Sequence, residues 1–170
     1  MNGYIDMEIK RVKYLPELRK VAELADEIWH ECFVDIISLE QIDYMVEKFQ
    51  SLDAMCSQIE NQKYSYAAIY DNGELCGYIG TKPEEEKFFL SKFYLRSDKR
   101  GTGMASEMMR FVFYEAKFYG KKSVYLTVNK QNERAIKFYK KMGYEIIDKT
   151  VTDIGKGFVM DDFIFECDLK

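Results

Sequence analysis

The stretch from residue 87 to residue 142 constrains the fold more than any other part of the chain. It begins with a strand-like segment, KFFLSKFYL (87–95), and after a glycine turn and a helical segment it continues with a second one, SVYLTV (123–128). Between the strands, apolar residues recur at helical spacing, namely Ala105, Met109, Val112, Ala116 and Tyr119. We therefore expect a right-handed parallel crossover over residues 88–128.

The N-terminal half predicts one strand and three helices. YIDMEIKRV (4–12) alternates apolar and polar residues, and an amphipathic helix follows from Leu15. Ser38 and Gln41 have the spacing of a capping box at the start of a second helix, and Ser51 is expected to cap a short third helix. The inner face of the second helix is predicted to carry Ile42, Met45, Val46 and Phe49.

The remaining segments complete the sheet. Asp71-Asn72-Gly73 separates two β-rich runs and predicts a hairpin, because a primed turn needs positive φ. NERAIKFYKKM (132–142) is a helix stopped by Gly143, and two closing strands follow it. The predicted fold class is α/β, with a mixed, mostly antiparallel, twisted sheet of about six to seven strands and helices on both faces. Residues 1–170 are expected to form a single domain.

Composition excludes several classes of function. The net charge of −4 gives no basic footprint for nucleic acid, and no apolar run approaches the roughly 18 residues of a membrane span. Four scattered cysteines without a CxxC pair predict buried free thiols in a reducing cytoplasm. With His30 as the one histidine, we expect no metal site. A cytoplasmic monomer or homodimer is expected.

The turn RSDKRGTGMASEMM (96–109) joins the first strand of the crossover to its helix. Glycines permit positive φ and close ligand approach, and unpaired N–H groups at a helix N-terminus favour anions, with Arg100 adding a charge. An ordinary strand-to-helix turn with surface cations is the alternative. A Walker A loop would need Lys-Ser/Thr after Gly103, and a dinucleotide loop would need a third small residue and a later acidic residue. Both templates fail here.

A third template fits. RGTGMA (100–105) resembles the pyrophosphate loop of the GNAT superfamily of acetyl-CoA-dependent N-acetyltransferases, whose pattern is Gln/Arg-x-x-Gly-x-Gly/Ala. LTVNKQNERAIKFYKKMGYE (126–145) is similar to the family's next block, and LSKFYL (90–95) to the strand before the loop. The places that match the second block are Asn132, Ala135, Tyr139, Gly143 and Tyr144. The resemblance covers roughly residues 64–168.

The resemblance implies acetyl-CoA as co-substrate, bound in a V-shaped gap between strands ending near Leu95 and Val128. Phe93 to Leu95 would bond the pantetheine arm from a bulge, and an N–H near Leu95 would polarise the thioester carbonyl. The family pattern places cofactor contacts at Phe93, Tyr94, Leu95, Arg100, Gly101, Thr102, Gly103, Met104, Ala105, Asn132, Ala135 and Tyr139. An amine would attack the thioester directly, without a covalent enzyme intermediate.

Tyr139 is the candidate general acid, which in the family protonates the departing thiolate; a core tyrosine is the alternative. Asn132 is expected to cap its helix and contact the cofactor. Many relatives place a glutamate base where this chain has Phe89. Glu31 and His30 are therefore the candidate bases, with ordered water as another route.

The amine acceptor is less constrained. The segment EIWHECFVDIISLEQIDYMVEKFQS (27–51) faintly resembles the helical insert of bacterial diamine and polyamine acetyltransferases. Its acidic residues would attract a cationic acceptor, or they would simply form the solvent-exposed faces of two helices. They are Glu27, Glu31, Asp35, Glu40, Asp43 and Glu47. A protein or peptide amine, an amino sugar, and a non-catalytic acetyl-CoA-binding module are the alternatives.

Overall fold

A computed structural model describes residues 6–170, so positions 4 and 5 of the first predicted strand lie outside the described residues. The strands are β1 (Met7–Arg11), β2 (Ser65–Asp71), β3 (Glu74–Pro83), β4 (Lys87–Leu95), β5 (Ser123–Asn129), β6 (Glu145–Gly155) and β7 (Phe158–Asp168). The helices are α1 (Leu15–Cys32), α2 (Leu39–Met45), α3 (Leu52–Asn61), α4 (Met104–Phe118) and α5 (Glu133–Lys141), with a π-helical segment Val46–Gln50 and a 3₁₀ turn Ser97–Lys99.

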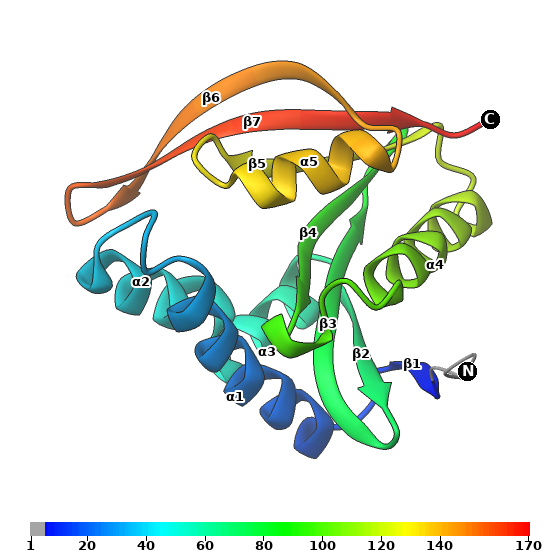
Figure 1. The fold of residues 1–170 in the computed structure, drawn as a ribbon, viewed down its shortest axis with the longest axis horizontal. Helices are drawn as coiled ribbons and strands as arrows, with labels where there is room; N and C mark the ends of the chain where they lie inside the picture. Colours follow the sequence, from blue (N-terminus) through cyan, green and yellow to red (C-terminus); the bar gives the residue numbers. More distant parts are fainter. Residues whose placement is uncertain (1–5) are drawn as a thin grey trace. The chain divides into compact units, whose positions relative to one another are not determined.

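The sheet has seven strands in the order β1-β2-β3-β4-β5-β7-β6. β4 and β5 are parallel, whereas the pairs β1–β2, β2–β3, β5–β7 and β6–β7 are antiparallel. The expected fold class, α/β with a mostly antiparallel sheet, is confirmed (Figure 1). Among residues 6–170, no helix combines the length and apolar character that a membrane crossing requires.

The chain divides into two compact units. The first unit contains residues 6–82 and 92–108, and the second contains residues 83–91 and 109–170. β4 and α4 each contribute residues to both units.

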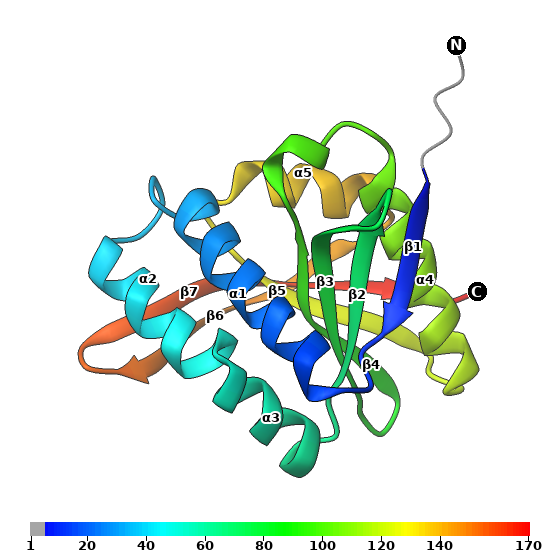
Figure 2. The same cartoon turned by 90° about the horizontal axis from the view of Figure 1, so that it is seen from below.

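In the first unit, helices pack on one face of the β1–β3 strands (Figure 2). The core joins residues from α1, α3, β2 and β3, and it contains Leu18, Val21, Leu24, Ala25, Ile28, Met55, Tyr66, Ala68 and Tyr78. The three- and four-residue spacing of the α1 positions brings them onto a single face of the helix. Burial of this stripe holds α1 against the strands.

A polar network lies inside this unit beside the π-helical segment. The Lys92 ammonium donates to the Phe49 carbonyl, to Gln58 Oε1 at 2.9 Å and to the Tyr66 hydroxyl at 2.5 Å. Burial lowers the pKa of Lys92 to about 7. The Gln58 amide also donates to the Phe49 carbonyl, at 3.1 Å, so that carbonyl is bonded outside its helix. The sequence predicts that one regular helix continues through Val46 and Phe49. In the structure, Val46–Gln50 is π-helical instead, and these tertiary hydrogen bonds lie beside it.

In the second unit, aromatic contacts join α5 to β7, and β4 to the segment that follows α4. Tyr139 of α5 packs against Phe165 of β7 with ring centroids 6.0 Å apart, and Phe88 of β4 stacks on Tyr119 after α4.

The predicted α4 stripe needs correction, because Ala105 is only half-buried and Tyr119 is 44% exposed. Its buried face instead adds Met104 and Met108, one helical turn apart.

Local turn and cap predictions are confirmed. Asn72 and Gly73 both have positive φ, at 50° and 80°, as a primed hairpin turn requires. The Ser38 and Ser51 hydroxyls accept hydrogen bonds from the N–H groups of Gln41 and Ala54. All four cysteines are free thiols, but only Cys76 is fully buried.

Candidate active site

The turn between β4 and α4 has the backbone of an anion-binding loop. Gly101 and Gly103 have φ of +74° and +88°, a region that L side chains rarely adopt. A Cβ built at either glycine would meet nothing within 4 Å. The glycines therefore serve backbone conformation, and the space in front of them is open to a ligand.

Unsatisfied donors gather on this loop. Met104 N–H has a long contact of 3.4 Å to Thr102 Oγ1, and Glu107 N–H bonds the Gly103 carbonyl at 3.3 Å. The other N–H groups of 101–106, those of Gly101, Thr102, Gly103, Ala105 and Ser106, have no hydrogen-bond partner within the described part of the chain. These donors lie at the positive end of the α4 dipole, which is an arrangement suited to phosphate.

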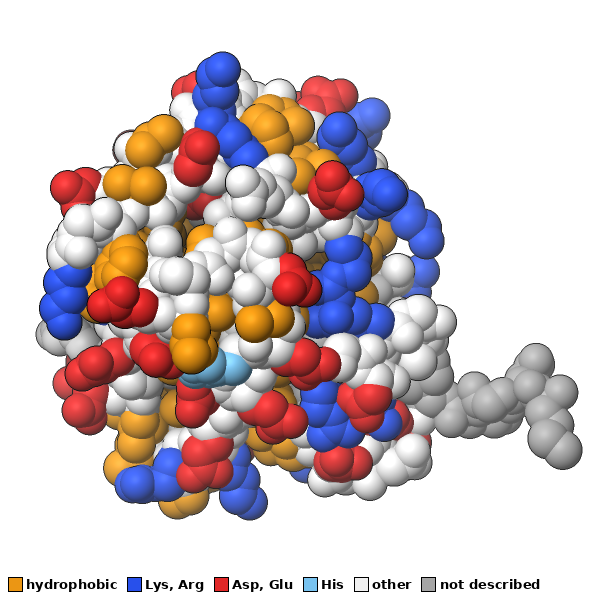
Figure 3. All heavy atoms as spheres, turned by 60° about the vertical axis from the view of Figure 1, so that its left-hand side comes forward, with side chains coloured by type: hydrophobic (Ala, Val, Ile, Leu, Met, Phe, Trp, Pro, Cys, Tyr) orange, Lys and Arg blue, Asp and Glu red, His pale blue; other side chains and the backbone are white. Residues whose placement is uncertain are grey.

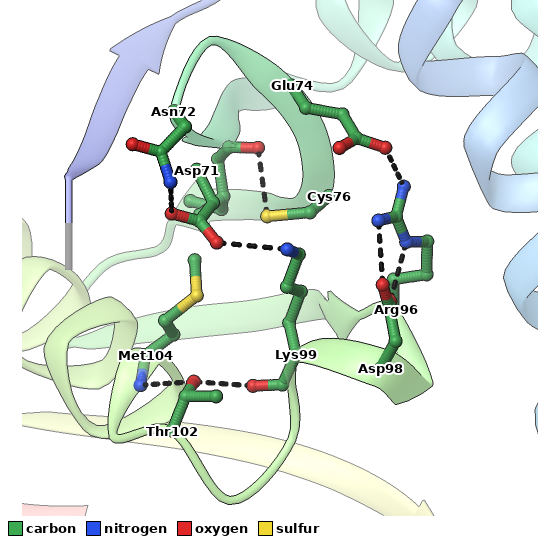
Figure 4. A network of polar contacts seen from close by, with 10 residues as sticks. Asp71, Asn72, Glu74, Cys76, Arg96, Asp98, Lys99, Thr102 and Met104 are labelled. Atoms are coloured by element: carbon green, nitrogen blue, oxygen red, sulfur yellow. Dashed lines mark hydrogen bonds and ion pairs between the residues drawn. The ribbon is translucent and has the colours of Figure 1, made fainter. Parts of the chain in front are cut away.

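The three cations around the loop have different partners. Arg96 bonds both Glu74 and Asp98, and Lys99 pairs with Asp71 at 3.0 Å (Figure 4). Arg100 instead donates to Cys32 Sγ at 2.7 Å and pairs with no carboxylate among residues 6–170. Arg100 is therefore the cation whose charge a bound anion could neutralise, as the sequence predicts.

The end of β4 departs from regular strand alternation. Burial alternates from Phe88 to Lys92, but Phe93 and Tyr94 are both half-buried before buried Leu95. β3 approaches closely here, since a Cβ on Gly77 would lie 2.7 Å from the Tyr94 carbonyl oxygen. The predicted bulge and its contacts to a pantetheine arm stay predictions.

β4 and β5 are joined over only a short ladder. The parallel pairs run from Lys87–Ser123 to Phe89–Tyr125, and both strands then continue for several residues. On its other side, β5 pairs with β7 along its whole length. In the second unit, β5 from Leu126 onward thus has no ladder partner on the β4 side among the described residues. The gap itself stays a prediction.

Tyr139 is buried on α5, at 8% exposed, among the rings of Phe138, Tyr144 and Phe165. Burial raises the pKa of its phenol well above the ordinary value near 10, so the hydroxyl keeps its proton throughout the usual assay range. A general acid must hold a proton, and Tyr139 does. Asn132 caps the same helix, because its Oδ1 accepts from the Ala135 N–H at 3.3 Å.

The two predicted bases are both occupied by other groups. Glu31 accepts a hydrogen bond from the Ser97 hydroxyl. His30 lies between Asp26 and Asp43, with Nε2 2.6 Å from Asp43 Oδ1. The hydrogen bond with Asp43, followed by the contact with Asp26, raises the pKa of His30, so more of the imidazole already carries a proton near neutral pH and less of it can act as a base. Phe89, which stands where many relatives have a base, stacks on Tyr125 at 4.8 Å.

Sequence reasoning missed Asp162, a carboxylate on β7 that is only 7% exposed. A signal was present in FVMDDFIF, because strand alternation points one of two consecutive aspartates toward each face. Which one is buried depends on the pairing of β7 with its neighbours, and no local pattern fixes that pairing.

Comparison with known proteins identifies the class of protein. Residues 21–144 match the model of the Acetyltransferase (GNAT) family, which is more than half of the chain. The chain therefore belongs to the GNAT family, and it is an acyltransferase enzyme.

Individual relatives agree with this assignment. An uncharacterized N-acetyltransferase of Mycobacterium bovis is 37% identical over 111 residues, or 65% of this chain and 71% of that protein. The PaiA N-acetyltransferase of Thermoplasma acidophilum, crystallised with coenzyme A, has a TM-score of 0.82 at 23% identity, covering 96% of this chain and 99% of that chain. A GCN5-related N-acetyltransferase of Rhodopseudomonas palustris has a TM-score of 0.77 at 15% identity, covering 98% and 100%. These structural likenesses show the fold.

Proposed function

We propose that this protein transfers the acetyl group of acetyl-CoA to a primary amine by direct attack, and that the acceptor is a polyamine or diamine. The observation that carries the cofactor assignment is the loop 101–106, with five unpartnered N–H groups beside Arg100. A pyrophosphate would accept hydrogen bonds from these donors and neutralise the guanidinium.

In the proposed reaction, the amine nitrogen forms a bond to the thioester carbonyl carbon and the C–S bond breaks. An N–H near Leu95 would stabilise the oxyanion, and Tyr139 would give its proton to the departing thiolate. The buried phenol supports this role because it stays protonated at neutral pH.

A groove in the first unit supports a cationic acceptor. It lies between α1 and the segment that runs from α2 to the start of α3, and its volume is about 370 Å³. Acidic side chains outnumber basic ones in its lining, which contains Glu23, Asp26, Asp43 and Glu47 together with Arg19 and His30. In Figure 3, acidic side chains surround the histidine on this face. Glu23 and Glu47 form no ion pair with any residue that the structure describes.

The acceptor proposal predicts salt-dependent turnover of spermidine. Its kcat/KM should fall as salt is raised from about 0.05 to 0.5 M, since attraction between exposed charges is screened over about 8–10 Å near physiological ionic strength. The variant Glu23→Gln/Glu47→Gln should raise the KM for spermidine roughly 2–10-fold, because each exposed ion pair contributes about 0.2–1 kcal/mol.

The matched control is Glu27→Gln/Glu40→Gln, which removes two exposed acids that do not line the groove. This control should keep the parental KM. If both double variants changed the KM equally, the groove would not be the acceptor site. If the enzyme acetylated peptide amines but not spermidine, the acceptor would not be a polyamine.

Ligand-induced stabilisation tests the cofactor directly. Acetyl-CoA at about 100 times its Kd should stabilise the folded protein by roughly 2.7 kcal/mol, seen as a higher thermal midpoint, and NAD should not. Stabilisation by NAD alone would contradict the assignment of the loop to coenzyme A.

A further inference from the structure

Asp162 has an unusual environment for a carboxylate. Its neighbour Asp161 is exposed and paired with Lys130, whereas Asp162 is only 7% exposed. The Asp162 side chain makes no hydrogen bond or ion pair with any residue in the described range 6–170. Its oxygens are not among the fully buried atoms without a partner in the described residues, so the carboxylate is mostly covered but still reaches solvent. Covering a carboxylate without giving it a hydrogen-bond partner is unfavourable, so its retention at this strand position needs an explanation.

The position of Asp162 along β7 places it beside the end of β5. The antiparallel register places Asp162 opposite Asn129, the last residue of β5, and Phe163 opposite Val128. This is the stretch of β5 beyond the last parallel pair, Phe89–Tyr125. Asp162 therefore lies beside the end of β5 where the family resemblance places the acetyl-pantetheine.

Asp162 also lies on the opposite face of the sheet from Tyr139. Phe165 contacts the Tyr139 ring of α5, and Asp162 comes three positions earlier in the regular ladder between β5 and β7. The register shift between β6 and β7 in this stretch falls on β6, between Ile146 and Asp148. Successive side chains on a strand alternate between faces, so Asp162 points away from α5. A proton acceptor on one face and a proton donor on the other would serve an amine that arrives and a thiolate that leaves on opposite sides.

We propose that Asp162 is the general base, and that its carboxylate accepts the proton of the acceptor ammonium directly or through one water. This inference rests on the proposed function. The deprotonated nitrogen then bonds the carbonyl carbon, and the C–S electron pair leaves with sulfur, which takes the Tyr139 proton. The second nitrogen proton is lost as the intermediate collapses, and it restores the phenol. Asp162 then releases the proton that it accepted to solvent, so one proton is released in each turnover.

The surroundings of Asp162 support this role. Burial, followed by the negative charge of Asp161, raises its pKa to about 6, while Lys130 opposes the shift. The side chains opposite it on the flanking strands, Asn129 and Thr150, are uncharged. A base with a pKa near 6 is ionised at neutral pH and accepts protons more readily than an ordinary aspartate does.

The test compares Asp162→Asn with Asp161→Asn in the full-length protein, using acetyl-CoA and the best amine from a panel. The parent should lose kcat as the pH falls through about 6, because Asp162 becomes protonated. Asp162→Asn should lower kcat at pH 7.5 by roughly 10²–10⁴-fold and abolish this limb. Its deficit in kcat/KM should shrink as the pH approaches about 10.4, where an alkylamine acceptor arrives deprotonated. Asp161→Asn should keep kcat within a few-fold.

Folding and cofactor binding are measured in the same samples. A carboxyl with a raised folded-state pKa loses stability as the pH rises from about 4 to about 6, so Asp162→Asn should be at least as stable as the parent at pH 8. Its Kd for acetyl-CoA should be parental. Asp162→Glu, which keeps the carboxylate, should recover part of kcat.

The outcomes separate this inference from the proposed function. A parent that acetylates no amine contradicts the proposed function itself. An active parent together with an Asp162→Asn variant that keeps its kcat and its acidic limb overturns the role of Asp162 alone. A loss of kcat that is uniform across pH and equal in Asp162→Glu also overturns it.

Discussion

Replacing Tyr139 with phenylalanine is expected to lower kcat by roughly 10²–10⁴-fold while leaving the Kd for acetyl-CoA nearly unchanged. The substitution keeps the ring, which packs against Phe138, Tyr144 and Phe165, and removes the hydroxyl that would protonate the thiolate. Because the proton is needed as the thiolate leaves, the loss should fall on kcat. Steady-state kinetics with the best amine, together with calorimetric binding of acetyl-CoA, measure both quantities.

The pH dependence follows from the buried position of Tyr139. A phenol with an ordinary pKa near 10 would give an alkaline limb in the pH profile near pH 10. Burial raises the pKa of Tyr139 beyond that range, so we expect no tyrosine limb below pH 10 in the parent.

Tyr144→Phe is the matched control for Tyr139→Phe. It also removes a buried hydroxyl, one that contacts Met109 Sδ at 3.2 Å, and it keeps the aromatic ring that the family block requires. It should retain kcat within a few-fold. If Tyr139→Phe matched this control, Tyr139 would be a core residue and the thiolate would leave without its help.

Replacing Gly103 with valine is expected to raise the Kd for acetyl-CoA by roughly 10–100-fold. Gly103 has φ +88°, which valine adopts only with strain, so the loop should rearrange and lose N–H donors to the pyrophosphate. Hydrogen bonds to charged groups contribute about 1.5–3 kcal/mol each, and the loss of one of them corresponds to roughly this range. No neighbouring atom obstructs the new side chain, so the thermal midpoint should fall only modestly.

Gly120→Val supplies the comparison at equal backbone strain. Gly120 also has positive φ, +68°, and open space around it, but it lies after the C-terminal end of α4. Its stability should fall similarly and its affinity for acetyl-CoA should be parental. Parental affinity in Gly103→Val would contradict the assignment of this loop to the pyrophosphate.

Much of the fold follows from local sequence signals. The hairpin turn at Asn72-Gly73 and the caps at Ser38, Ser51 and Asn132 involve residues within three positions of one another, so short patterns predict them. The π-helical segment Val46–Gln50 was not predictable in this way. Its Phe49 carbonyl is bonded by Lys92, 43 residues away, and no local pattern specifies that contact.

The same distinction between local and long-range contacts applies to the candidate site. The glycine loop is a contiguous motif, so the positive φ of its glycines follows from the sequence. The surroundings of Arg100 do not, because its partner Cys32 is 68 residues away. The base could not be predicted, because burial of Asp162 depends on the register of β7 against β5 and β6. The sequence also could not show that Glu31 and His30 are already hydrogen-bonded. Their partners, Ser97 and Asp43, become neighbours only in the fold.

Release of the coenzyme A thiol in the presence of acetyl-CoA and a panel of amines tests the central claim most directly. The panel should contain spermidine, putrescine, a lysine peptide, a peptide with a free N-terminus and an amino sugar. The account predicts thiol release that requires both acetyl-CoA and an amine, with spermidine or putrescine as the best acceptor, and an acetylated amine found by mass spectrometry. Tight binding of acetyl-CoA without amine-dependent thiol release would contradict it and would identify a non-catalytic acetyl-CoA-binding module.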